Sequence, residues 1–249
     1  MRIQHKIRDF CNINFLRFLL DLDRGSSLFL NRAAQHYPAF DQTVVVLSNS
    51  DLVKGGVLLA LFWGLWFGRA RDLTAARQHL LAGLAGSLVA LGIARALSYL
   101  LPHRLRPLLE PDLHFLPPSG LPDQSNWTNW SSFPSDHAAL FFAIVCGLWF
   151  VSARIGWAAL VYLLLVVIWP RLYVGIHYPS DVLAGAVIAW LCVFLLDRRS
   201  LRARWTGPVL RTLEDFPALG YTIFFLLTFQ IATLFWDVRI FLSYFGFST

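Results

Sequence analysis

Six long apolar runs, separated by short polar stretches, dominate the pattern of this chain. They cover residues 52–68, 80–101, 137–153, 156–174, 182–196 and 221–236. A helix needs about 20 mostly apolar residues to cross roughly 30 Å of hydrocarbon, and several of these runs are somewhat shorter. The runs lack the alternation of apolar and polar residues that is typical of a membrane β-barrel. The pattern therefore predicts an all-α integral membrane protein with about six transmembrane helices in a bundle.

The composition agrees with this prediction. Of the 249 residues, 57% are hydrophobic and 14% are charged, and the mean hydropathy is +0.56. These values do not suit a water-soluble globule with a single core. The net charge of +6 would fit a nucleic-acid partner in a soluble chain. Because the basic residues here lie in loops between apolar runs, they indicate membrane topology, and we expect no nucleic-acid binding.

Arginines mark one side of the predicted bundle. They lie between the first and second, third and fourth, and fifth and sixth runs, and they are Arg69, Arg71, Arg77, Arg154, Arg198, Arg199, Arg202, Arg204 and Arg211. All three loops fall on one face, which the positive-inside rule predicts to be cytoplasmic. The long loop 102–136 and the short turn 177–181 then open on the outer face, which is periplasmic in a Gram-negative cell.

Residues 1–50 differ from the rest because apolar and charged residues are mixed in them. Such a mixture is typical of amphipathic helices that lie in the membrane interface. We therefore divide the chain into an interfacial N-terminal segment, 1–50, and a six-span membrane unit, 51–249. Six spans place both termini outside, which is an unusual position for a basic N-terminal segment.

His177 and Asp181 lie where the fifth apolar run begins. Pro179 favours the first position of a helix, which places Tyr178 at the N-cap and Asp181 at N3. From N3 the carboxylate can fold back over the helix start and reach a ring nitrogen of His177. That contact would fix the imidazole tautomer and leave the other nitrogen free for nucleophilic attack. The alternative is that Asp181 only caps the helix and His177 is an interfacial histidine.

A second helix start carries His137, directly after Ser135 and Asp136. Ser135 is a good N-cap, and a helix start offers unpaired N–H groups and the positive end of the helix dipole to an anion. A phosphate bound there would lie close to the His137 imidazole, which can deliver a proton near neutral pH. An ordinary capped helix with a histidine in its first turn is the alternative.

Four arginines belong to the same predicted edge of the membrane, namely Arg95, Arg104, Arg106 and Arg171. Arg171 stands near the end of the fourth run, where a charge beside hydrocarbon is costly, so we expect it to face a polar cavity. The planar guanidinium suits phosphate oxygens better than a lysine ammonium does. Arg104 and Arg106 could instead extend into the headgroup region. Together these helix ends predict a phosphate site.

Two of the blocks resemble the signature of the type 2 phosphatidic acid phosphatase superfamily. Residues 134–137, Pro-Ser-Asp-His, are similar to its second motif, Pro-Ser-Gly-His, and Arg171-x5-His177-x3-Asp181 matches the third. The resemblance covers roughly residues 94–185. The Pro-Ser-Asp-His form looks like the bacitracin-resistance type of undecaprenyl diphosphate phosphatase. It implies dephosphorylation of a polyprenyl diphosphate at the outer face of a bacterial cytoplasmic membrane.

Three positions depart from the family pattern. Pro170 replaces the serine before the arginine of the third motif. Asp136 replaces the glycine of the second motif, which puts a carboxylate beside the anion site, where it must point away or repel the phosphate. If the Arg-Pro pair of the first motif, Lys-x6-Arg-Pro, begins at Arg106, Tyr99 stands in place of its lysine. Arg95 lies one helical turn earlier and is long enough to supply the missing cation.

The resemblance implies a role for each site residue. His177 attacks the terminal phosphorus and forms a phosphohistidine, Asp181 stabilises the charge on its imidazole, and His137 protonates the departing lipid phosphate. The equatorial oxygens are held by the backbone N–H groups around Ser135 and His137 and by Arg171, Arg104 or Arg106, and Arg95. Positioning and charge stabilisation suffice for phosphoryl transfer in this scheme, without a metal or cofactor.

Other functions stay open at this point. Two histidines and an aspartate could bind zinc, although clustered arginines would repel it. A transporter would carry ionisable residues near the midplane, and a silent lipid-binding protein would lack His137, His177 or Asp181. The closest alternative is a phosphatase or phosphotransferase for phosphatidylglycerophosphate, phosphatidic acid or lipid A. The expected partners are a lipid phosphate and membrane lipids, and the sequence makes no prediction of oligomeric state.

Overall fold

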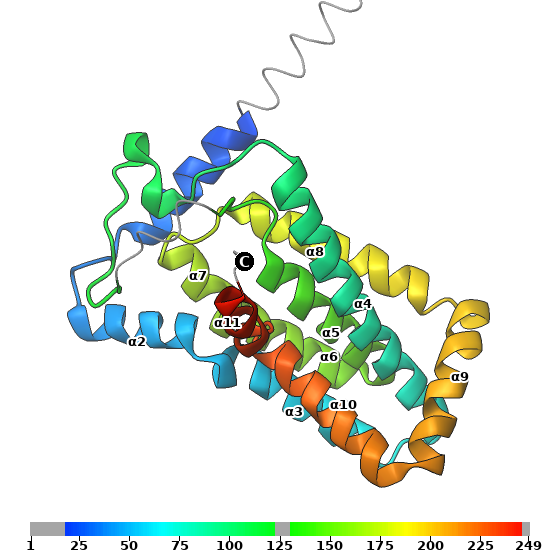
Figure 1. Cartoon of the computed structure of the whole chain (residues 1–249). Helices are drawn as coiled ribbons and strands as arrows, with labels where there is room; N and C mark the ends of the chain where they lie inside the picture. The colour runs from blue at the N-terminus through cyan, green and yellow to red at the C-terminus, as the bar shows by residue number, and fades with distance from the viewer. Residues whose placement is uncertain (1–17, 123–129, 246–249) are drawn as a thin grey trace, which may run out of the picture.

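The computed structural model describes residues 18–122 and 130–245, and within these ranges the regular elements are all helices (Figure 1). A helix over residues 18–31 comes first. It is followed by α2 (Pro38–Asn49), η1 (Leu52–Gly56), α3 (Val57–Trp66), α4 (Leu73–Leu100), η2 (Pro107–Leu109), η3 (Pro111–Leu113), α5 (Asp136–Val151), α6 (Ala153–Tyr162), η5 (Leu163–Ile168), α7 (Trp169–Tyr173), α8 (Pro179–Leu196), α9 (Arg199–Asp215), α10 (Pro217–Ala232) and α11 (Trp236–Tyr244).

The apolar runs of the sequence are helical in the structure, but not all of these helices are long enough to be counted as spans. Among the described residues three helices are long and apolar enough to cross a membrane, namely Leu73–Leu100, Ala153–Tyr173 and Pro179–Leu196. A fourth span is possible if Pro38–Asn49 and Leu52–Trp66, which meet at 63°, cross together. The expected six spans are therefore supported only in part. Helix α2, which we expected to lie in the interfacial segment 1–50, forms this bent pair with the helices of the first apolar run.

The two remaining apolar helices, α5 and α10, are shorter than a span. Each has 16 residues, which at 1.5 Å per residue gives about 24 Å. For α5 the surroundings give a reason, because α4, α8 and α6 pack around it. Leu140, Phe141 and Leu148 are fully buried there. A helix that is apolar all round and enclosed by protein needs no direct contact with lipid.

The outward faces of α8 and α10 are apolar and exposed. On α8 they carry Leu183, Val187, Trp190, Leu191 and Phe194, and on α10 Ile223, Phe225, Leu226 and Phe229. Exposed apolar surface of this extent is typical of a surface that contacts lipid. The structure is thus that of a membrane protein.

The two ends of the bundle carry different chemistry. At one end α4 and α7 finish while α5 and α8 begin, so both motif blocks lie there. At the other end His79, near the start of α4, contacts Asp197 after α8 at 2.8 Å, and Arg202 of α9 contacts the same carboxylate at 3.0 Å. The arginine-rich loops therefore lie opposite the motif blocks, as the sequence predicts.

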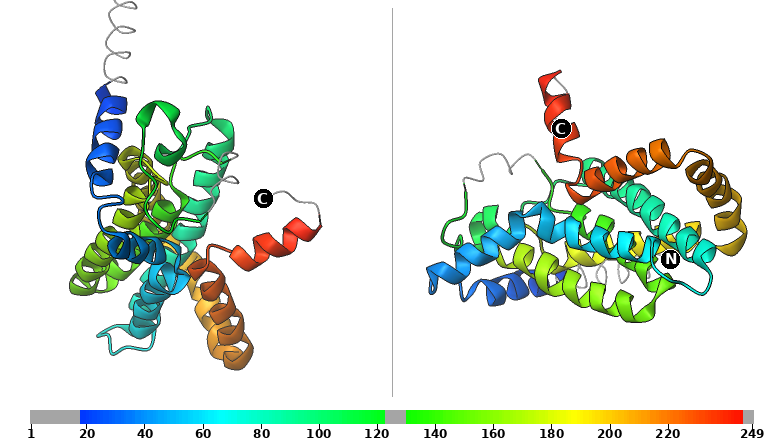
Figure 2. Two further views of the ribbon diagram at one scale, coloured as in Figure 1. Left: turned by 90° about the vertical axis from the view of Figure 1, so that its left-hand side faces the viewer. Right: turned by 90° about the horizontal axis from the view of Figure 1, so that it is seen from below.

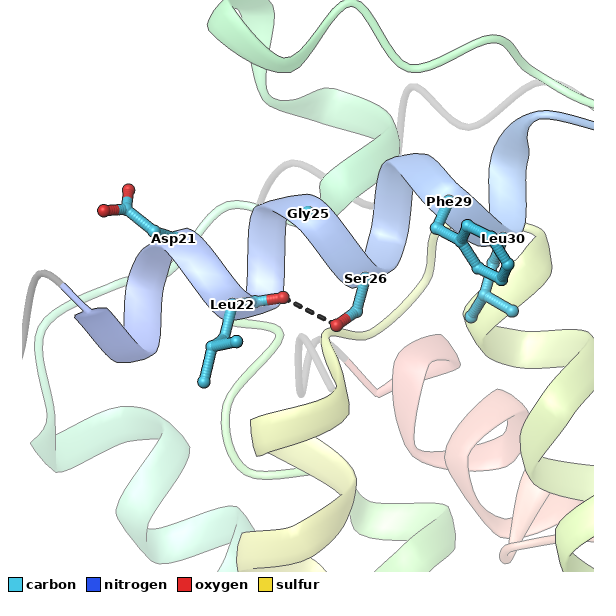
Figure 3. A pocket seen from close by; sticks show the side chains of 6 residues that line it. All are labelled: Asp21, Leu22, Gly25, Ser26, Phe29 and Leu30. Carbon is cyan, nitrogen blue, oxygen red and sulfur yellow. Dashed lines mark hydrogen bonds between the residues drawn. The ribbon is translucent and has the colours of Figure 1, made fainter.

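The N-terminal helix 18–31 lies beside the motif end of the bundle (Figure 1). A shallow groove of about 450 Å³ follows this helix. Figure 3 shows its lining, with Phe29 and Leu30 close together near one end of the helix and Asp21 near the other. Leu22 and Phe29 are at least half exposed. The groove shares no residue with the motif blocks. At the other end of the chain, α11 extends away from the bundle (Figure 2).

Candidate active site

The turn between α7 and α8 sets the spacing between Arg171 and His177. The N–H of Ile176 donates to the carbonyl of Arg171 at 3.0 Å, and the N–H of Gly175 donates to that of Leu172 at 3.1 Å. This pair of bonds is a Schellman motif, which requires a left-handed residue after the helix. Gly175 supplies it with φ +78°, and a Cβ there would lie 2.6 Å from the ring of Phe115. The glycine turn therefore places Arg171 and His177 at one site.

The start of α8 has the predicted cap. Tyr178 is the N-cap and Pro179 the first helical residue, and the N–H of Tyr178 donates to Oδ2 of Asp181 at 2.7 Å. Oδ1 of Asp181 accepts a 2.6 Å hydrogen bond from Arg104. The Asp181 side chain is fully buried and both its oxygens have partners.

The contact between Asp181 and His177 differs from the expectation. Oδ2 of Asp181 lies 3.8 Å from Nδ1 of His177, beyond hydrogen-bond distance. Nδ1 instead lies 2.9 Å from the carbonyl oxygen of Ser132. Because a carbonyl only accepts, Nδ1 must carry the proton and Nε2 the lone pair. The backbone of Ser132 thus fixes the tautomer, while Asp181 acts through its charge because Tyr178 and Arg104 already hold its oxygens.

His177 has the properties of a nucleophile. Its Nε2 is buried and has no hydrogen-bond partner among the described residues. Burial lowers the pKa of His177 below its ordinary value, and the charge of Arg171 acts in the same direction. The imidazole is therefore neutral near pH 7, with its free lone pair facing the site.

The start of α5 brings the second histidine to the same place. Ser135 is the N-cap, and its Oγ accepts from the N–H of Ala138 at 3.4 Å. The N–H of Ser135 donates to the carbonyl of Asp181 at 3.0 Å, which joins the two helix starts directly. Gly185 permits this approach, because a Cβ there would lie 2.5 Å from the carbonyl oxygen of Ser135. Ser135 therefore holds the helices together and does not line the cavity described below.

Asp136 neither points away from the site nor leaves a bare charge there. Its Oδ1 accepts from Nδ1 of His137 at 2.9 Å and from the N–H of His137 at 2.8 Å. Its Oδ2 accepts from Arg95 at 2.6 Å. The carboxylate orients His137 with Nε2 available for the reaction, and Arg95 neutralises it. The N–H of His137 is thereby occupied, contrary to the expected role of that group in phosphate binding.

A cavity of about 1110 Å³ opens between these residues. Its charged lining consists of Lys54, Arg95, Arg106 and Arg171 against Asp51 and Asp136, with His103, His137 and His177 as further titratable groups. Four cations therefore face two carboxylates. An excess of positive charge in a partly enclosed space favours an anion such as a phosphate.

The predicted arginines take different positions. Arg171 is buried, lines the cavity and has an Nε without a hydrogen-bond partner in the described part of the chain. Arg106 and Arg95 also line it. Arg104 does not, because its guanidinium binds Asp181 and, at 2.7 Å, Asp23 of the helix 18–31. The structure thus brings three of the four arginines to the cavity with both histidines.

Sequence reasoning missed three contributors to the site. Lys54 enters the cavity from η1, far from all motifs. The carbonyl of Ser132 and the carboxylate of Asp23 reach His177 and Arg104 from distant segments. The sequence did offer a signal for Lys54. A lysine inside an apolar run must find a polar environment, so its position in the first run could have pointed to a cavity.

Comparison with known proteins identifies the family of the chain. The family model described as PAP2 superfamily matches residues 83–205. Undecaprenyl-diphosphatase BcrC of Bacillus subtilis (strain 168) is 31% identical over 168 residues, which are 67% of this chain and 78% of that protein. The putative undecaprenyl-diphosphatase YbjG of Escherichia coli (strain K12) is 30% identical over 146 residues, 57% of this chain and 65% of that protein.

A third relative has a different stated substrate. Lipid A 4'-phosphatase of Bacteroides thetaiotaomicron is 34% identical over 87 residues, 31% of this chain and 36% of that protein. No solved structure matches the chain significantly. The coverage of BcrC and the family match show that the chain belongs to the PAP2 superfamily. Its helices and motifs are those of a membrane-bound lipid phosphatase.

Proposed function

We propose that this protein hydrolyses the terminal phosphate of a polyprenyl diphosphate, converting undecaprenyl diphosphate to undecaprenyl phosphate. The observation that carries the proposal is the unpartnered Nε2 of His177 in a cationic cavity that also holds His137 and Arg171. The similarity to BcrC and YbjG supports the choice of substrate. The product would be the monophosphate lipid carrier of envelope synthesis.

In the first step Nε2 of His177 attacks the terminal phosphorus. A P–N bond forms as the bond from phosphorus to the bridging oxygen breaks. Burial and the charge of Arg171 lower the pKa of His137 in the free protein. The negative charge of a bound diphosphate, however, favours the imidazolium, so His137 enters this step protonated on both ring nitrogens and donates its Nε2 proton to the bridging oxygen. Asp181 stabilises the positive imidazole, while Arg171, Arg106 and Arg95 bind the equatorial oxygens. The lipid phosphate leaves and a phosphohistidine remains.

In the second step His137, now neutral, takes a proton from water as the water attacks the phosphohistidine. The P–N bond breaks, orthophosphate is released, and both histidines return to their starting states. Asp136 keeps the ring of His137 in one orientation through both steps. One histidine can act as acid and then as base because the second step reverses the proton transfer of the first.

We place the reaction at the outer face of the bacterial cytoplasmic membrane. The support is the separation of the bundle ends, because the arginine-rich loops lie opposite the cavity and such loops favour the cytoplasm. Labelling a cysteine introduced at Ser119, in the loop on the cavity side, with a membrane-impermeant reagent tests this orientation in intact cells.

The second candidate substrate is another lipid phosphate, which the similarity to lipid A 4'-phosphatase favours. Purified protein should be offered undecaprenyl diphosphate, phosphatidic acid, phosphatidylglycerophosphate and lipid A, with phosphate release as the readout. We expect the highest kcat/KM for undecaprenyl diphosphate. Equal or faster turnover of any of the other three lipids contradicts the proposed substrate.

The nucleophile and the expected independence of metals have their own tests. His177→Ala should abolish turnover and the acid-labile phosphoenzyme, and a labelled phosphohistidine that persists in this variant identifies another nucleophile. Among the described residues no group of three or more His, Cys, Asp or Glu side chains is arranged to hold a metal ion. We expect activity to survive a strong chelator, and loss of activity that zinc restores would overturn this expectation.

A further inference from the structure

Lys54 is a buried cation that the reaction scheme above does not use. The whole chain has only two lysines, Lys6 and Lys54. Lys54 is 7% exposed, and its Nζ lies 3.0 Å from Oδ1 of Asp51. The Asp51 side chain is 40% exposed, so water competes for that carboxylate and the pair is weaker than a fully buried one. Burying a charge is costly, which indicates that Lys54 has a task in the cavity it lines.

The local backbone and two contacts hold Lys54 in this position. It belongs to η1, a segment of π-helix of the kind often found at functional sites. The carbonyl of Val53 accepts a 2.7 Å hydrogen bond from the hydroxyl of Tyr162. On the next residue, a Cβ added to Gly55 would overlap the backbone of Ala232. The backbone of this segment is thus fixed between the fourth apolar run and α10, which holds Lys54 at the cavity.

The charge of Lys54 acts on the side of the cavity where His137 lies. It acts on His137, and the charge of Arg171 acts in turn on Lys54. On His177 the cationic influences come from Arg171 and Arg106. Arg171 therefore acts on both histidines and Lys54 on His137, and all of these groups line the same cavity.

This arrangement matches the two phosphates of a diphosphate. The nucleophile binds the phosphate that is transferred, and the acid His137 stands at the bridging oxygen, so the cation beside His137 is next to the phosphate that stays on the lipid. We propose that Lys54 binds this lipid-side phosphate and gives the site its preference for a lipid diphosphate over a lipid monophosphate. The inference deepens the proposed function and rests on it.

The chemistry of the leaving group gives Lys54 a role in the transition state as well. When the bridging bond breaks, negative charge develops on the lipid phosphate, and an ammonium group already in place stabilises it. A monophosphate ester has an alkoxide leaving group and no second phosphate, so Lys54 has no partner there. Tyr99 of α4 occupies the position of the lysine in the family's first motif, and it is 74% exposed. Lys54 belongs to η1 and therefore does not correspond to that motif position.

A binding experiment tests the proposal without catalysis. Titration of purified protein with methylenediphosphonate and with methylphosphonate should show tighter binding of the diphosphonate, by about tenfold, the value of one charge-assisted hydrogen bond. Lys54→Met should remove this preference while the affinity for methylphosphonate is kept, and Lys54→Arg should retain it. A wild-type protein without the preference, or a Lys54→Met variant that keeps it or loses affinity for both ligands equally, overturns the proposal.

A kinetic experiment separates this inference from the proposed function. With undecaprenyl diphosphate, Lys54→Met should lower kcat/KM by roughly tenfold to a hundredfold, whereas kcat/KM for phosphatidic acid should fall by a clearly smaller factor. An equal fall for both lipids would make Lys54 a general structural or phosphate-binding residue. If the wild type prefers the diphosphonate in binding yet turns over phosphatidic acid faster, the proposed substrate fails while the two-phosphate site stands. Thermal unfolding of each variant monitors the fold.

Discussion

Arg104 donates a 2.6 Å hydrogen bond to Oδ1 of Asp181, and the other end of its guanidinium binds Asp23 at 2.7 Å. The guanidinium also lies 4.0 Å from the ring centre of Tyr178. Asp23 further accepts hydrogen bonds from the N–H and the hydroxyl of Ser180. The helix 18–31 is thereby connected to the buried carboxylate that faces His177. We infer that Arg104 is a positioning residue and not a phosphate ligand.

Arg104→Gln should leave the carboxylate of Asp181 without its charged partner and lower kcat by roughly tenfold to a hundredfold, the value of a charge-assisted hydrogen bond. The KM for substrate should change little, because Arg104 does not line the cavity. Steady-state kinetics check this split. Arg24→Gln is the matched control, since Arg24 has an exposed 3.8 Å pair with Glu110. A rise in KM without loss of kcat would show that Arg104 binds the substrate phosphate.

Asp136→Asn should slow the reaction by about tenfold or more, because it removes the charge that orients His137 and leaves Arg95 without its carboxylate partner. Both chemical steps use His137, so phosphoenzyme formation and its hydrolysis should slow together in a rapid-quench experiment. Asp112→Asn, on the surface in η3, should have no effect. An unchanged rate in Asp136→Asn would mean that His137 is held by other contacts.

The acid limb of the pH–rate profile should lie below the ordinary pKa of histidine. In the proposed mechanism nucleophilic attack needs neutral His177, and burial lowers the pKa of this group from 6.5. A lowered pKa keeps the neutral form populated as the pH falls, so the midpoint of the decline in kcat/KM should lie below pH 6.5. The profile in a detergent-solubilised preparation measures this limb. A limb above pH 6.5 would show that a charged form of His177 is favoured in the free enzyme.

Gly185→Ala should destabilise the protein and reduce activity, because the new Cβ would lie 2.5 Å from the carbonyl of Ser135 and 2.8 Å from the side chain of Ala138. Overpacking of this kind costs about 1–3 kcal/mol of unfolding free energy. Gly92→Ala is the control, since nothing lies within 4 Å of its Cβ, and it should gain about 0.5–1 kcal/mol as a helical alanine. Thermal unfolding in detergent compares the two, and an equal Tm for both variants would contradict the close packing of α5 on α8.

Local rules accounted for the parts of the site that lie within one helix end. Ser135 and Tyr178 are N-caps as predicted, because capping depends on residues within a few positions of each other. The apolar runs likewise predicted helices. The six spans expected from them are not confirmed, since periodicity does not tell whether a helix such as α5 meets lipid or is enclosed by other helices.

Contacts between distant segments account for what the sequence could not predict. Asp23 and Arg104 are 81 positions apart, and Ser132 is 45 positions from His177. Whether Asp136 would repel a phosphate or orient His137 depended on Arg95, which approaches from another helix. Tertiary packing alone brings Lys54 to the cavity of the motif residues. The spacing of the motifs therefore could not predict its proposed role.

The carbonyl of Ser132 also bears on how such enzymes diversify. Every residue type carries this acceptor, so selection on the tautomer of His177, the proposed nucleophile, constrains the path of the main chain there and leaves the side chain free. Substitutions in the loop 102–136 can therefore change the substrate range while the tautomer of His177 is kept. An insertion or deletion that shifts position 132 should instead abolish activity, even when every motif residue is present. Indels near this position are a more informative sign of lost activity than substitutions.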